Sequence, residues 1–137
     1  MLFRSKEIYQ RELRTSIPVI VYVAPSGARA ASAGVWIAQA ADVLAMAPIA
    51  NIGSSTPINS TGANLPSDER RKAVNDAAAG LSALAAAHHR NAHWAVVAVT
   101  KASNLTSGEA LRSNVIDAVA PSLPALLRQL EIGRAHV

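Results

Sequence analysis

A near-continuous run of β-branched residues, Ile17–Ala24, most constrains the fold of this chain. The run does not alternate apolar with polar residues, which is typical of a strand buried on both faces of a parallel sheet. A helical pattern over residues 3–14 precedes it. The small-residue run Ala30–Ala41, which follows a break at Pro25, also has helical character. Helices and strands that alternate in this way predict a layered α/β fold.

The rest of the chain continues the alternation. Short strands are expected at Val43–Ala47, Asn51–Ser54 and Val115–Ala120, and a long helix at Asp68–Ala87 after a polar loop over residues 56–67. Capping residues indicate further helix boundaries: Asn91 opens a helix through about Lys101, Thr106 and Glu109 form a capping box, Asn114 is a left-handed stop, and Ser122 opens a helix through Leu130.

Composition favours one compact domain with a core of small side chains. The chain has 137 residues, of which 50% are hydrophobic, 4% aromatic and 29 alanine. Such a core requires many helices and close backbone approaches. No cysteine is present, which excludes a disulfide scaffold, a thiolate zinc site and a cysteine nucleophile.

The charge pattern argues against a nucleic-acid partner. The formal net charge is +4, and the basic residues are scattered. The single basic cluster, Arg70–Lys72, directly follows two acidic residues, whereas nucleic-acid binding requires a basic stripe with interleaved aromatics.

Both ends of the sequence are unusual for a complete domain. The chain begins directly in a helical pattern, so we expect an earlier strand of the same α/β unit in the parent protein. The heptapeptide Glu131–Val137 lacks a periodic pattern and matches the translation of a common sequencing adapter. We therefore expect residues 1–130 to be a single partial domain and residues 131–137 to be a non-native tail.

Ser32 is the candidate nucleophile, because it lies in a small-residue segment between the buried strand and a helix. A serine at such a junction can expose its hydroxyl at the positive end of the helix, as in hydrolases with a nucleophile elbow, although their G-x-S-x-G is absent. The alternative is that Ser32 only caps or packs the helix. Ser26 competes as nucleophile but is typical of an ordinary turn.

A serine nucleophile needs a base, and histidine is a poor candidate here. His88, His89 and His93 lie at or beyond the far end of the long helix. His89 and His93 have the spacing of a metal pair, but Asn91 interrupts the helix between them and no third ligand is evident. We interpret these histidines as solvated and expect no metal site.

Lysine is the remaining choice. Lys72 lies near the start of the long helix, and Lys101 is a weaker candidate. Asp42, an acidic candidate for the base, directly precedes a strand, and we interpret it as structural. A lysine acts as a base only when burial removes its proton, which closure of the preceding loop could provide. The alternative is a solvated lysine in a charged run.

A family resemblance bears on this choice. It is carried by PVIVYVAPSGARAASAG, AADVLAMAP, NIGSSTP, KAVNDAAAGLSALAAAHHRNAHWA and LTSGEALRSNVIDAVA, in order over roughly Ser16–Ala120. The chain resembles the N-terminal protease domain of NfeD-type membrane-bound serine proteases, which belong with signal-peptide-peptidase-A-like enzymes in the Clp-protease/crotonase superfamily. The resemblance implies part of a superhelix of β-β-α units.

The resemblance also implies a Ser/Lys dyad. Ser32 would form an acyl-enzyme, Lys72 would be the base, and the Ala33 N–H would donate to the oxyanion, with Gly34 and Asn75 as supporting residues. It implies no cofactor, and a hydrophobic peptide or a stomatin-like membrane protein as substrate. Full-length members would be membrane-associated homo-oligomers with an extracytoplasmic protease domain.

Two departures leave other readings open. The D-T-P-G-G segment that the family carries before its first helix is absent, as is a membrane region, so the chain could carry the dyad without being competent. A non-hydrolytic crotonase-like enzyme or a catalytically silent assembly module is the alternative. The crotonase reading is disfavoured because no glutamate lies between Glu12 and Glu69.

Overall fold

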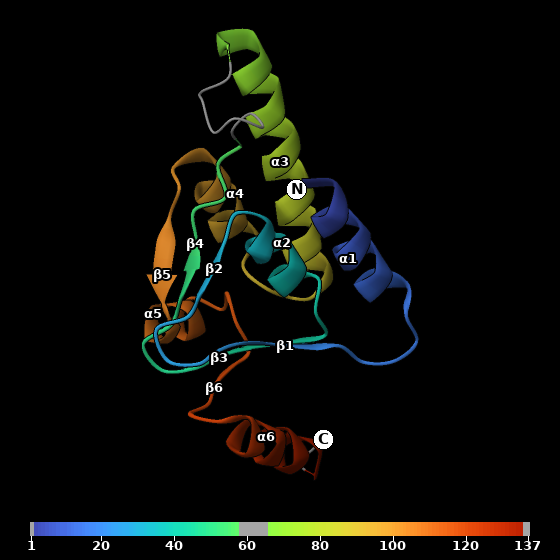
Figure 1. Ribbon diagram of the computed structural model, residues 1–137, viewed down its shortest axis with the longest axis vertical. Helices are drawn as coiled ribbons and strands as arrows, with labels where there is room; N and C mark the ends of the chain where they lie inside the picture. The colour runs from blue at the N-terminus through green and yellow to red at the C-terminus, as the bar shows by residue number, and fades with distance from the viewer. Residues whose placement is uncertain (1, 58–65, 136–137) are drawn as a thin grey trace.

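Six helices and six short strands make up the computed structural model, which describes residues 2–57 and 66–135 (Figure 1). In chain order the elements are α1 (Leu2–Arg14), β1 (Ile20–Val23), β2 (Arg29–Ala31), α2 (Ala33–Gln39), β3 (Val43–Met46), β4 (Asn51–Gly53), α3 (Ser67–Ala87), α4 (Ala92–Thr100), β5 (Asn104–Thr106), α5 (Ser107–Arg112), β6 (Ala118–Val119) and α6 (Leu123–Ala135).

The strands form two three-stranded sheets. One has the order β1-β3-β6 with all strands parallel, and the other has the order β2-β4-β5, in which β2 and β4 are parallel and β5 is antiparallel. Of the consecutive strands β1 and β2, one lies in each sheet, and helix α2 follows them. The consecutive strands β3 and β4 are likewise divided between the two sheets, and helix α3 follows. This repeat confirms the predicted α/β architecture of β-β-α units.

The first strand is shorter and more exposed than its sequence predicts. Only Ile20–Val23 is paired, Ile17 is 71% exposed, and Ile20 is 40% exposed. The prediction of burial on both faces was wrong. A β-branched run reports strand propensity, but β1 lies at the edge of its sheet and has a neighbouring strand on one side only.

A helix was predicted over Ala30–Ala41, and the predicted start of this helix was wrong. Residues Arg29–Ala31 form β2, which pairs with β4 from Asn51 to Gly53, and the helix occupies only Ala33–Gln39. Alanine favours a helix locally, but pairing with a strand distant in sequence outweighs that preference here.

Most helix boundaries follow the capping signals. The Asn91 side chain accepts from the Trp94 N–H, and Thr106 and Glu109 form the capping box. Asn114 has φ 59°. The last helix, in contrast, continues past Leu130 to Ala135, so residues 131–135 are helical. The strand at Val115–Ala120 contracts to two residues, and β5 was not predicted.

A buried arginine connects the C-terminal end of α2 and the link from α2 to β3 with Asp117, which directly precedes β6. Arg90 is 5% exposed and donates to the carbonyl oxygens of Gln39 and Ala41 and, at 2.7 Å, to Asp117 Oδ2. The same Asp117 oxygen accepts from the Leu44 N–H. A buried cation needs such a set of acceptors, so Arg90 fixes the C-terminal end of α2 against the sheet.

The end of α1 carries a perturbed carboxyl group. Burial of Glu12, with a smaller contribution from the charge of Asp42, raises its pKa from 4.5 to about 7. Its Oε2 atom is shielded from solvent and accepts no hydrogen bond from the described residues. The folded chain therefore binds more protons than the unfolded chain between these values, so its stability falls as pH rises from about 4.5 to 7.

Removing this charge should stabilise the fold above neutral pH. We expect Glu12→Gln to raise the melting temperature at pH 8 by about 4 °C, which corresponds to about 1 kcal/mol, because solvent screens a partly exposed carboxyl. At pH 4 the difference should nearly vanish. Thermal melts at both pH values measure it, with Glu7→Gln on the same helix as an exposed control. An equal gain at pH 4 and pH 8 would contradict the assignment.

Candidate active site

Ser32 has a backbone conformation that exposes its side chain. It precedes α2 with φ 52° and ψ −121°, and its hydroxyl makes no capping hydrogen bond to the helix. A positive φ in a non-glycine residue costs about 1–3 kcal/mol and persists only where the surroundings impose it. The Ser32 side chain is exposed. Ser32 therefore occupies the N-cap position of α2 without capping it through its side chain, and its geometry is that of an exposed serine at a strand-to-helix turn.

Two further serines hold the backbone of Ser32 in place. The Ser32 N–H donates to the Ser54 carbonyl oxygen at 3.1 Å, and the Ser55 hydroxyl donates to the Ser32 carbonyl oxygen at 3.1 Å. Ser54 and Ser55 are fixed in turn, because their N–H groups donate to the carbonyl oxygens of Ser103 and Ala98. Sequence reasoning missed both serines, and their only signal was their position directly after a short strand.

Loss of the Ser55 hydroxyl should loosen Ser32. Ser55 is 6% exposed, so Ser55→Ala removes a buried hydrogen bond, and we expect it to cost about 1–2 kcal/mol of stability. We also expect slower reaction of Ser32 with a fluorophosphonate, measured by mass spectrometry. Ser54→Ala is the matched control, since the Ser54 hydroxyl bonds to Ala102 and Asn104 at an exposed position. Equal labelling rates in both variants would contradict a positioning role for Ser55.

Ala33 and Gly34 begin α2 beside Ser32. The first N–H groups of a helix have no acceptor within it, so the Ala33 N–H is available to an oxyanion. A Cβ added at Gly34 would lie 3.9 Å from the Ala30 Cβ, which is ordinary contact. Packing therefore does not require glycine at position 34.

Lys72 and Asn75 lie on another element. Both are exposed on α3, one turn apart. This helix meets α2 where Gly80 lies against Trp36, since a Cβ at Gly80 would be 3.0 Å from the indole. Lys72 precedes Gly80 by eight residues, or about 12 Å of helix. Figure 1 shows the N-terminal part of α3 projecting above α2.

The structure thus groups Ser32, Ala33 and Gly34 but does not join Lys72 to them. Among the described residues, no hydrogen bond or ion pair connects Lys72 with Ser32. Most of the loop that was expected to close over Lys72, residues 58–65, lies outside the described residues. None of the described helices is long and apolar enough to cross a bilayer.

The competing candidates have structural explanations. Ser26 lies in an exposed turn, and Asp42 Oδ2 accepts from the Val19 N–H at 2.7 Å. His88 is hydrogen-bonded through Nδ1 to the Leu84 carbonyl oxygen, and Lys101 is exposed at the end of α4. Within residues 2–57 and 66–135, no three acidic or histidine side chains are grouped closely enough to hold a metal ion.

Comparison with known proteins identifies homologues. No family model matches the chain. The membrane-bound protease PH1510 of Pyrococcus horikoshii is 42% identical over 123 residues, which is 89% of this chain and 28% of that protein. This chain therefore spans about a quarter of that relative.

Three solved structures extend the comparison. A membrane-bound stomatin-specific protease, determined as a serine-to-alanine mutant, is 39% identical with a TM-score of 0.83, and the match covers 90% of this chain and 60% of that one. A lysine-to-alanine mutant in complex with a substrate peptide is 39% identical with a TM-score of 0.82, covering 90% of this chain and 57% of that one. An enoyl-CoA hydratase from Thermoplasma volcanium, 20% identical with a TM-score of 0.62, shares the crotonase fold alone.

Proposed function

Because this chain is a homologue of the N-terminal protease domain of NfeD-type membrane-bound serine proteases, we propose that it is a serine endopeptidase domain with Ser32 as nucleophile and Lys72 as base. The observation that carries the proposal is the exposed, uncapped hydroxyl of Ser32 in a positive-φ turn, held by Ser54 and Ser55.

The choice of Lys72 is supported by its place in the chain. One solved structure has a serine replaced by alanine, and the other has a lysine replaced by alanine. The distance along the chain from that serine to that lysine equals the distance from Ser32 to Lys72 to within one residue. Lys72 is exposed in this structure. We therefore propose that bound substrate covers the start of α3 and supplies the desolvation that a neutral amine requires.

The proposed reaction proceeds through an acyl-enzyme. The Ser32 Oγ attacks the scissile carbonyl carbon as its proton passes to the neutral Lys72 amine, and the Ala33 N–H donates to the oxyanion. The C–N bond then breaks, and the leaving amine takes the proton from Lys72. Lys72 next takes a proton from a water molecule whose oxygen attacks the acyl carbon. The ester bond between that carbon and Ser32 Oγ breaks, the peptide acid leaves, and Lys72 returns the proton to Ser32 Oγ. These steps use no cofactor.

The proposed substrate and the proposed cellular location of the parent protein are based on its relatives. Both solved structures are described as a stomatin-specific protease, and one of them was solved in complex with a substrate peptide. We propose that the parent of this chain cleaves hydrophobic segments of a stomatin-like membrane protein. In this proposal the parent is a membrane-associated homo-oligomer with its protease domain outside the cytoplasm, and Asn75 and Gly34 support the dyad.

A fluorophosphonate, which bonds covalently to activated serines, tests the nucleophile directly. The 137-residue chain is treated with the reagent, and the modified peptide is mapped by mass spectrometry. We expect the label on Ser32, its loss in Ser32→Ala, and its retention in the control Ser26→Ala. A label on another residue, or an unlabelled wild-type chain, overturns the proposal. The outcome also separates a protease from a crotonase-like or silent module, because neither needs a reactive serine.

A further inference from the structure

Helix α1 gathers basic charge on its exposed surface. Four of the 13 lysine and arginine residues of the chain lie within residues 4–14, namely Arg4, Lys6, Arg11 and Arg14. All four are exposed. The helix also has two acidic residues, and burial raises the pKa of one of them, Glu12, to about 7. At neutral pH, α1 therefore carries four positive charges against fewer than two full negative charges.

Helical spacing places three of these cations on one face. Residues three, four or seven positions apart are neighbours on a helix, so Arg4, Arg11 and Arg14 lie along one side with Ile8 between them. Ile8 is 48% exposed. No ion pair within residues 2–57 and 66–135 involves these three arginines. We call Arg4, Ile8, Arg11 and Arg14 the basic face of α1.

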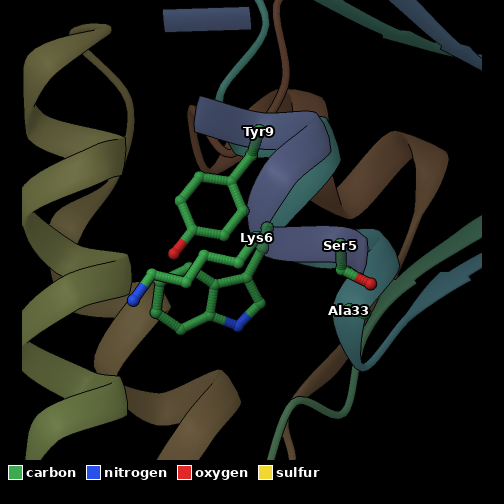
Figure 2. Close-up of a pocket in the computed structure, with 5 residues that line it drawn as sticks. Ser5, Lys6, Tyr9 and Ala33 are labelled. Atoms are coloured by element: carbon green, nitrogen blue, oxygen red, sulfur yellow. The ribbon is translucent and has the colours of Figure 1, made fainter. Parts of the chain in front are cut away.

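The opposite face of α1 packs against the rest of the molecule. The ring centroids of Tyr9 and Trp36 of α2 are 5.5 Å apart. Figure 2 shows the Tyr9 and Lys6 side chains directed toward α3, and with Ser5, Ala33 and Trp36 they line a pocket of about 180 Å³. This packing turns the basic face away from the core, and Figure 1 shows α1 at the outer edge of the molecule.

A shallow depression on the outer side of α1 can hold an anionic headgroup. It has a volume of about 560 Å³ and is lined by Glu7, Ile8, Gln10, Arg11 and Arg14. The two guanidinium groups are suited to phosphate, whose oxygens accept paired hydrogen bonds from an arginine. Glu7 opposes an anion in the same depression, so the net charge of its lining is positive but reduced.

Exposed isoleucines beside the arginines favour a lipid surface as the occupant. Ile17, in the segment directly after α1, is 71% exposed, and Ile8 lies within the basic face. A helix with both basic and apolar exposed residues binds at a bilayer surface, where its cations meet phosphates and its apolar side chains enter the acyl boundary. A second copy is disfavoured, because two basic faces repel each other.

We propose that the basic face of α1 docks this domain on an anionic phospholipid bilayer, with its arginines on headgroup phosphates and Ile8 and Ile17 in the apolar boundary. The inference goes beyond the proposed function, since it involves neither Ser32 nor Lys72. Because α2 packs against α1 and directly follows Ser32, docking through α1 would hold the candidate nucleophile close to the bilayer.

Vesicle binding by the 137-residue chain tests the proposal. Vesicles of phosphatidylcholine alone are compared in a sedimentation assay with an equimolar mixture of phosphatidylcholine and phosphatidylglycerol. We expect at least about tenfold tighter binding to the anionic vesicles at about 0.1 M salt, and loss of most of this difference at about 1 M salt, where the screening length is about 3 Å. Equal binding to both kinds of vesicle, or binding to neither, overturns the proposal.

Two double variants locate the binding on α1. Arg11→Gln combined with Arg14→Gln should weaken binding to the anionic vesicles about 25-fold, or about fivefold for each arginine. The control combines Arg112→Gln with Arg128→Gln, which removes the same charge from exposed positions on α5 and α6 and should change binding by less than about twofold. Equal losses in both double variants would show a response to net charge alone and overturn the assignment to α1.

Two single variants act in opposite directions. Glu7→Gln should tighten vesicle binding about fivefold, a gain that a loss of structure does not explain. Ile8→Ser should weaken it about fivefold, because an apolar contact is lost. Circular dichroism verifies folding in each case. Weaker or unchanged binding by Glu7→Gln, or unchanged binding by Ile8→Ser, overturns the proposal.

A competition assay distinguishes a lipid surface from an acidic protein. Polyglutamate carries negative charge but has no phosphate and no acyl boundary, so it should compete poorly at equal charge concentration. Polyglutamate that displaces the chain from the vesicles would show a site for acidic polypeptides and overturn the lipid assignment. Fluorophosphonate labelling of Ser32 reports on the proposed function independently of these results.

Discussion

Replacing Ser32 with alanine is expected to reduce cleavage of a hydrophobic peptide by at least about a thousandfold, because no other group then forms the acyl-enzyme. The exposed Ser32 side chain contributes no capping bond, so the fold should survive the change. Peptide cleavage by the 137-residue chain is followed by mass spectrometry, with circular dichroism as the folding control. Turnover that persists in folded Ser32→Ala would overturn the assignment.

Lys72→Ala is expected to cause a loss of similar size, because the serine would then lack its base. Lys101→Ala is the matched control: Lys101 is also an exposed lysine near a helix end, and its replacement should leave cleavage unchanged. No hydrogen bond connects Lys72 with Ser32 in this structure. Lys72→Ala therefore tests whether α3, which projects beyond α2, participates in the reaction. A loss in the Lys101 variant alone would transfer the role of base to Lys101.

Gly53→Ala is expected to destabilise the chain by about 3 kcal/mol or more. Gly53 ends β4 with φ +143°, and an added Cβ would overlap the carbonyl oxygen of Ser103 and lie 2.7 Å from the Asn104 Cα. Both contacts are with backbone, so β4 and β5 must separate to admit the methyl group. The next residue, Ser54, accepts the Ser32 N–H, so the reactivity of Ser32 should fall together with the stability. Urea denaturation and fluorophosphonate labelling measure the two effects.

Gly27→Ala separates the cost of the close approach from the cost of the backbone angle. Gly27 has φ +89°, and nothing lies within 4 Å of an added Cβ. We expect this variant to lose only about 1–2 kcal/mol, the usual penalty for a positive φ in an alanine residue. Equal losses at both positions would show that backbone angle alone accounts for the effect at Gly53.

Local signals in the sequence were enough to predict several helix boundaries. Asn91, Thr106 and Asn114 mark helix boundaries through bonds within a few residues of themselves, and all three were confirmed. The small-residue segment around Ser32 indicated a turn into a helix. The family resemblance was confirmed at 42% identity, because it rests on the order of many residues and not on one motif.

Local signals failed where distant segments decide the structure. Nothing near Arg29–Ala31 indicates a strand, because β2 forms only through its pairing with Asn51–Gly53. The supporting role of Ser55 was hidden for the same reason, since its hydroxyl reaches a carbonyl 23 residues earlier. The exposure of Ile17 and Ile20 also depends on the place of β1 in its sheet and not on their own identity.

The sequence by itself determined the alternation of helices and strands, the helix caps and the kinship with serine proteases, because each depends on residue type and order along the chain. Only the tertiary structure decided the positive φ of Ser32, its attachment to Ser54 and Ser55, and the aromatic pocket between α1 and α2. These features arise from contacts between segments far apart in the chain, whose free energy of packing outweighs local backbone preference.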